Sequence, residues 1–177
     1  MANGIKIFGH AVHPMLIVFP LGLLATSLGF DLAYLANGDP TFGIVSFWMI
    51  SAGIIGGLLA AVFGLIDWLA IPAGTRAKFI GLWHGLGNVV VVLLFVWSWW
   101  LRLSVAQYTP TPSALTLSCI AVASALVTGW LGGELVERLG VGVDPGAHPN
   151  SPNSLSGRAA TDLSHPGPGR SHVIPRA

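Results

Sequence analysis

Four long blocks of apolar residues, separated by short polar segments, make up most of the chain. The blocks cover about residues 14–36, 42–71, 77–102 and 113–139. Each block reaches the roughly 20 residues that an α-helix needs to cross the hydrocarbon core of a bilayer. The pattern therefore predicts an all-α fold, an integral membrane four-helix bundle within residues 10–140.

Turn-forming residues mark the boundaries of these blocks and predict the start of the first helix. Clusters that contain Gly, Pro or Asn favour turns between the blocks. These clusters are Asn37–Pro40, Pro72–Gly74 and Thr109–Pro112. Pro14 disfavours the helical conformation at His13 and suits the first position of a helix. We expect the first helix to begin near Pro14 with His13 as its cap, and to kink at Pro20.

The two ends of the chain differ from the apolar blocks. Residues 1–9 form a short leader, and the run that follows is longer than the apolar core of a secretory signal peptide, so we expect it to remain as the first span. Residues 141–177 are rich in Pro, Gly, Ser, Asn and His. Such a segment buries too little surface to offset its ordering entropy and is predicted to be a disordered tail. Its widely spaced histidines are expected to lie in solvent: His148, His165 and His172.

Composition agrees with a membrane protein and excludes some partners. Of all residues, 53% are hydrophobic and 8% are charged, whereas a soluble domain has about 25% charged residues. The net charge of +1 gives no clustered basic face that would bind nucleic acid. The single cysteine, Cys119, excludes an intrachain disulfide.

Basic residues indicate the orientation of the chain. The leader, the second connection and the segment after the fourth block contain Lys or Arg, whereas the first connection has none and the third has only Arg102 at its edge. Because cytoplasmic connections are enriched in Lys and Arg, both termini are predicted to be cytoplasmic.

Two histidines and two carboxylates are predicted to share one depth near the cytoplasmic side. His84 lies about 9 Å inside its helix, and Asp67 and Glu134 lie about 6 to 8 Å inside theirs. His13 stands at the start of the first helix, on the same side of the membrane. Ionisable residues within a membrane are costly and usually mark a functional site.

This layer could hold a cofactor. Imidazole and carboxylate together suit zinc, iron, copper or manganese, and the lack of cysteine ligands excludes a thiolate site. A b-type haem needs two axial histidines from different helices, which His13 and His84 supply. Asp67 and Glu134 would then be further ligands, or would orient the imidazoles.

Two more residues extend the candidate site. His10 precedes the first helix and is a further candidate ligand. Asn88 lies one helical turn beyond His84 and would support its ring.

Other interpretations stay open. The layer could be a polar lock between helices in a structural or accessory membrane subunit without a cofactor. It could also be a membrane metallohydrolase site in which a metal activates water and Glu134 or Asp67 acts as base, or a path for protons or ions. Between an enzyme and a protein without catalytic activity, the sequence favours the second and leaves the first open.

Asp31 is separate from this layer. It lies 18 residues beyond His13, which places it about 27 Å away near the opposite membrane surface. We expect it to meet water there or to pair with Arg102.

Glycines form flat stripes on the second and third blocks. Gly53, Gly57 and Gly64 recur at spacings that place them on one face, and Gly81 and Gly85 flank His84. Such faces let helices approach closely. We interpret them as packing surfaces within the bundle, which could also join copies into a homo-oligomer.

The motifs assembled above resemble the domain-of-unknown-function 2231 family of small four-helix bacterial membrane proteins. The matching segments are His13-Pro14, Phe19-Pro20-Leu21, Gly64–Trp68, Gly81–Gly85 and Gly132–Val136. The resemblance implies a four-helix domain in the bacterial inner membrane. Family members sometimes stand in longer chains beside Rieske iron-sulfur or cytochrome c domains, which implies membrane electron transfer with a redox partner protein or respiratory complex. Many members carry a histidine where this chain has Val18.

Overall fold

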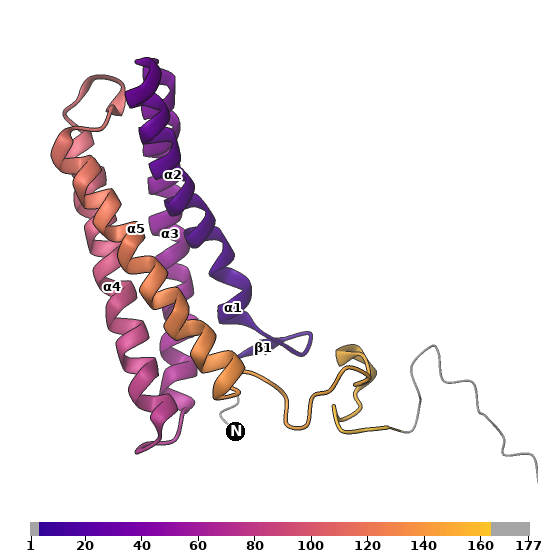
Figure 1. The fold of residues 1–177 in the computed structure, drawn as a ribbon. Coiled ribbons are helices and arrows are strands. Elements are labelled where there is room, and N and C mark those ends of the chain that lie inside the picture. Colours follow the sequence, from indigo (N-terminus) through magenta and orange to yellow (C-terminus); the bar gives the residue numbers. More distant parts are fainter. Residues whose placement is uncertain (1–3, 164–177) are drawn as a thin grey trace, which may run out of the picture.

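Four long helices span the bundle in the computed structural model, which describes residues 4–163 (Figure 1). The helices are α2 (Val18–Asn37), preceded by the short α1 (Val12–Leu16), then α3 (Pro40–Ala70), α4 (Arg76–Arg102) and α5 (Pro112–Gly133), which continues into the π-helical turn η2 (Glu134–Arg138). Within the described residues, four helical segments are long and apolar enough to cross a membrane. The predicted all-α membrane bundle is confirmed.

The two ends of the bundle differ in charge. We call one the basic end; it contains Lys6, Asp67–Lys78 and Glu134–Arg138. The other, the far end, contains the α2–α3 connection and the α4–α5 connection, in which the short 3₁₀ helix η1 (Ala106–Tyr108) lies.

Side-chain caps begin three of the long helices. Asp39, Thr75 and Thr111 each accept a hydrogen bond from a backbone N–H in the first turn of α3, α4 and α5. The bond from the Thr41 N–H holds the pKa of Asp39 below its usual value. These caps satisfy backbone donors that have no partner within the helix.

A short hairpin sets the start of the first helix. Strands β1 (Lys6–Ile7) and β2 (His10–Ala11) pair antiparallel, and the Val12 N–H donates to the Ile5 carbonyl over 3.0 Å. The hairpin leads directly into α1, so the cap is Ala11. The prediction that His13 caps the helix is wrong, since His13 lies in its first turn.

The predicted kink at Pro20 takes the form of a break between α1 and α2. The break falls at Ile17. A proline has no N–H to donate, so Pro20 cannot bond to the Leu16 carbonyl. Ile17 keeps helical φ and ψ of −64° and −18°, and its N–H donates to the His13 carbonyl, so the chain continues from α1 into α2 as one span.

The helices pack as two antiparallel pairs, α2 with α3 and α4 with α5, and α3 also packs on α4. Residues from all four long helices form the apolar core: Leu24, Ile50, Val91, Phe95 and Ala121. Many other large apolar side chains are exposed on the outer faces, a distribution typical of helices that lie in lipid.

The described part of the tail consists of turns. Residues 141–163 contain only one short helix, η3 (Ser154–Ser156), and an ion pair joins Asp144 to Lys6 of the hairpin. His148 is half-buried, not in solvent as predicted, and its Nδ1 accepts from the Asn150 N–H. His165 and His172 lie outside the described residues.

Glycine at position 53 should be required for the contact between α2 and α3. A Cβ added there would lie 2.6 Å from Cγ and Cδ2 of the buried Leu24. Overpacking of this kind costs about 1–3 kcal/mol, so Gly53→Ala should lower the thermal unfolding temperature in detergent. Gly22→Ala is the matched control, since no atom lies within 4 Å of its added Cβ. Equal unfolding temperatures of the two variants would contradict the packing role.

Candidate functional site

Two histidines from different helices meet near the basic end. His13 projects from α1 and His84 from α4, and their ring centroids lie 6.3 Å apart with the ring planes at 89°. Both side chains are partly buried. The structure thus brings together the two histidines that the sequence singled out.

A backbone carbonyl holds each ring by its Nδ1. His13 Nδ1 lies 2.9 Å from the Ala60 carbonyl oxygen on α3, and His84 Nδ1 lies 2.9 Å from the Thr128 carbonyl oxygen on α5. A carbonyl only accepts, so each Nδ1 carries the proton. In a neutral imidazole this leaves the Nε2 lone pair available as acceptor or metal ligand.

Glycines provide the space in which the rings lie. A Cβ added at Gly64 would come within 2.8 Å of His13 Cε1, and one added at Gly132 within 3.1 Å of His84 Cε1. Gly64 belongs to the small-residue face that the sequence predicted as a packing surface on the second block, whereas Gly132 lies on the fourth block and was not part of that prediction. At this depth both glycines pack against imidazole rings.

Asn88 supports His84, as its position one turn along α4 predicted. Its amide donates to the His84 carbonyl over 2.8 Å and lies 3.3 Å from His84 Nε2. The Thr128 hydroxyl donates to the Asn88 side-chain oxygen over 3.1 Å. Asn88 and Thr128 therefore fix the ring from two helices.

The carboxylates of the predicted layer bind other groups. Asp67 accepts from the Ile5 N–H over 3.2 Å, and Glu134 accepts from the Arg76 guanidinium over 2.6 Å. His10 is exposed on β2. Among residues 4–163, no three His, Cys, Asp or Glu side chains come together as a set that could hold a metal ion. Of the predicted layer, the structure brings the two histidines together and gives the two carboxylates other partners.

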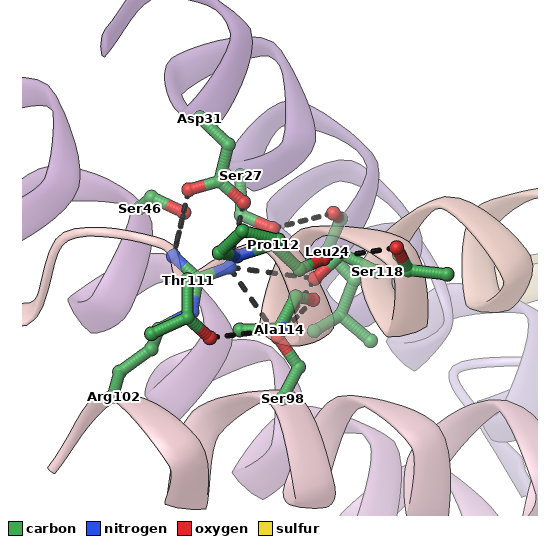
Figure 2. A network of polar contacts seen from close by, with 11 residues as sticks. Leu24, Ser27, Asp31, Ser46, Ser98, Arg102, Thr111, Pro112, Ala114 and Ser118 are labelled. Atoms are coloured by element: carbon green, nitrogen blue, oxygen red, sulfur yellow. Dashed lines mark hydrogen bonds and ion pairs between the residues drawn. The ribbon is translucent and has the colours of Figure 1, made fainter. Parts of the chain in front are cut away.

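A second polar site lies at the far end, where Arg102 and Asp31 form a fully buried ion pair (Figure 2). Both side chains have zero exposure. The two terminal nitrogens of the Arg102 guanidinium each donate to one Asp31 oxygen over 2.7 Å. Of the two expectations for Asp31, pairing with Arg102 is confirmed and contact with water is wrong.

Buried serines surround this ion pair. Arg102 also donates to the hydroxyls of Ser46, Ser98 and Ser118, over 3.3, 3.3 and 3.4 Å. Ser98 in turn donates to the Ala114 carbonyl over 2.8 Å. The network joins α2, α3, α4 and α5, as Figure 2 shows. The sequence did not single out these serines, although all three lie in the apolar blocks.

Comparison with known proteins identifies one family. A family model described as predicted membrane protein, DUF2231, matches residues 9–145. The matched range includes the four long helices, both histidines and the ion pair. No curated protein and no solved structure matches the chain.

The ion pair should be required for stability. Asp31→Ala leaves the guanidinium of Arg102 buried without its counter-charge, and breaking a buried pair costs about 3–5 kcal/mol. We expect a large fall in the thermal unfolding temperature in detergent. The double variant Asp31→Leu, Arg102→Met is the control: it removes both charges at similar volume and should recover most of the loss. If the double variant unfolds at the same low temperature as Asp31→Ala, the charges themselves are needed, and the prediction is contradicted.

Proposed function

The chain belongs to the DUF2231 family of predicted membrane proteins, and we propose that His13 and His84 bind a b-type haem that carries electrons within the membrane. Two imidazoles on separate helices, each anchored by Nδ1, are the observation that carries the proposal. The protein would lie in a bacterial inner membrane. Because cytoplasmic connections are enriched in Lys and Arg, Arg76 and Lys78 at the basic end support an orientation with both termini cytoplasmic.

The separation of the two rings suits a single metal ion between them. Imidazole nitrogens bind metals at about 2.0–2.1 Å, so two imidazoles on opposite sides of one ion have ring centres roughly 6 Å apart. The observed separation of His13 and His84 is 6.3 Å. The separation of the rings therefore supports the proposed ligand pair.

The anchors of the two rings also suit ligation. A histidine that binds a metal usually donates its other ring N–H to a carbonyl or carboxylate, which fixes its orientation and makes the free nitrogen more basic. The carbonyls of Ala60 and Thr128 take this role for His13 and His84. Each Nε2 is then the available donor atom.

A haem fits this donor set better than a bare zinc, iron, copper or manganese ion. A bare ion in a protein usually takes three or more protein ligands, whereas a haem would be held by one or two protein side chains. Within residues 4–163 the two histidines have no third ligating side chain beside them. When bound, the haem would supply one-electron redox chemistry.

In this proposal the chain positions the iron and leaves the chemistry to the haem. His13 and His84 would bind from α1 and α4, while Asn88 and Thr128 hold the second ring. The lipid bilayer surrounds the helices, and electrons would come from a redox partner protein or respiratory complex.

A cofactor-free structural role is the second candidate, and one contact favours it. The Asn88 amide lies 3.3 Å from His84 Nε2, so this lone pair already has a weak donor. In that case the histidines would act as a polar lock between helices in an accessory subunit. A metallohydrolase has less support, because Asp67 and Glu134 bind Ile5 and Arg76 and lie apart from the histidine pair.

Loss of either histidine should abolish haem binding. Protein purified gently from cells supplied with haem precursor should show the sharp reduced α band of a b-type haem after dithionite treatment. His13→Ala and His84→Ala should each lose this band while still inserting into the membrane. His10→Ala, an exposed neighbour, is the control and should keep it. A band that survives both substitutions would falsify the ligand pair.

Elemental analysis of the same samples separates the alternatives. Stoichiometric zinc, copper or manganese without the α band would replace the haem by a metal ion. Neither metal nor haem, together with lower thermal stability of His84→Ala, would favour the lock.

Gly64, which lies against the His13 ring, should be required for full intensity of the same reduced α band. Gly64→Ala places a Cβ 2.8 Å from His13 Cε1 and should displace the ring, so the α band should fall severalfold in intensity per protein. Gly85→Ala is the control beside His84, because no atom lies within 4 Å of its added Cβ. If Gly64→Ala and Gly85→Ala both bind haem as the unsubstituted protein does, haem binding does not depend on the present position of the His13 ring, and the prediction is contradicted.

A further inference from the structure

The N-terminal hairpin extends sideways from the bundle, away from the helix axes (Figure 1). Its large apolar side chains are unusually exposed: Ile7 is 48% and Phe8 is 76% exposed. About half of Ile7 and three quarters of Phe8 are thus left uncovered by the described residues.

The turn of the hairpin holds Phe8 in a strained conformation. Ile7 pairs with His10, so Phe8 and Gly9 form a two-residue loop, and both have positive φ, 51° and 82°. Such loops favour Asn, Asp or Gly, and a bulky residue there is costly. A phenylalanine that is both strained and exposed is hard to explain by the stability of the isolated chain.

The first span sets the depth of the hairpin. It runs from Val12 to Asn37, 26 residues, about 39 Å at 1.5 Å per residue, whereas the hydrocarbon core is about 30 Å thick. The span is therefore longer than the core, and the hairpin, which ends directly before Val12, lies outside the core at the level of the headgroups.

Two tryptophans support this depth. Trp83 adjoins His84, and Trp130 lies one turn or less from Thr128, which binds His84, so both lie at the level of the histidine pair. They are 54% and 67% exposed. Exposed tryptophans concentrate at the membrane–water interface, which places His13 and the adjacent hairpin there too.

The two faces of the hairpin differ in what covers them. Neighbouring strand residues point to opposite faces, so Lys6 shares one face with its partner Ala11, and Ile7 shares the other with its partner His10. Lys6 forms an ion pair with Asp144 of the tail, and Ser154 lies against Gly9. The tail thus covers part of the hairpin, while Ile7 and Phe8 remain uncovered.

We propose that the hairpin is an interfacial anchor whose tip, Ile7 and Phe8, inserts into the boundary between headgroups and acyl chains at the basic end. Burial of apolar side chains at this boundary is the usual basis of such attachment. The anchor would hold α1, and with it His13, at a fixed depth. The ligand is the lipid surface itself, and the proposal is independent of any cofactor.

Spin labels can measure the depth of the tip in vesicles of phosphatidylethanolamine and phosphatidylglycerol. The full chain with Cys119→Ala would carry a single new cysteine, Phe8→Cys or Ile7→Cys. Collision with lipid-soluble oxygen is compared with collision with a water-soluble nickel complex. Leu126→Cys on the lipid face of α5 and Ala73→Cys in the α3–α4 connection give the lipid and water references.

The anchor predicts that labels at positions 7 and 8 collide with oxygen severalfold more than with nickel, as the Leu126 label does. Nickel collision equal to that of the Ala73 label would place the tip in water and overturn the proposal. Protection from both reagents would also overturn it, since the tip would then contact protein, either a second copy or the tail. Helical circular dichroism confirms that each labelled chain is folded.

Discussion

The buried pair of Arg102 and Asp31 is the contact on which the arrangement of the helices most depends. Lipid is as apolar as the helix surfaces, so apolar burial gives little force for association, and packing and hydrogen bonds decide which helices meet. The guanidinium reaches a carboxylate on α2 and hydroxyls on α3, α4 and α5. A single side chain thereby specifies how all four helices approach at the far end. Small serines are needed around it because larger residues would hold the helices apart.

Both polar sites have a contact on the first span. Asp31 on α2 binds Arg102 at the far end, while His13 on α1 lies 2.9 Å from the Ala60 carbonyl oxygen of α3. Ile17, between α1 and α2, keeps helical φ and ψ of −64° and −18°. The two contacts lie about 27 Å apart along the helix, so one span carries a polar contact at each end of the bundle.

The sequence predicted those features that depend on position along a helix. Spans, turns and the family followed from it, and pairing with Arg102 was one of its two expectations for Asp31. It failed where direction around the axis decides. It did not reveal the partners of Asp67 and Glu134, which are the Ile5 N–H and the Arg76 guanidinium. The hairpin was missed because its strands have two residues each and its Phe-Gly turn is atypical.

The two polar sites leave different atoms without a partner. At the far end both oxygens of Asp31 accept short hydrogen bonds, while Arg102 Nε is buried without a partner among the described residues. At the histidine pair each Nδ1 lies 2.9 Å from a carbonyl oxygen. His13 Nε2 has no hydrogen-bond partner within residues 4–163, and His84 Nε2 has a long one. The chemistry of the open atoms differs: Arg102 Nε carries a proton and can only donate, whereas Nε2 of a neutral imidazole offers a lone pair. The proposed haem would use these two lone pairs, on rings whose centroids lie 6.3 Å apart.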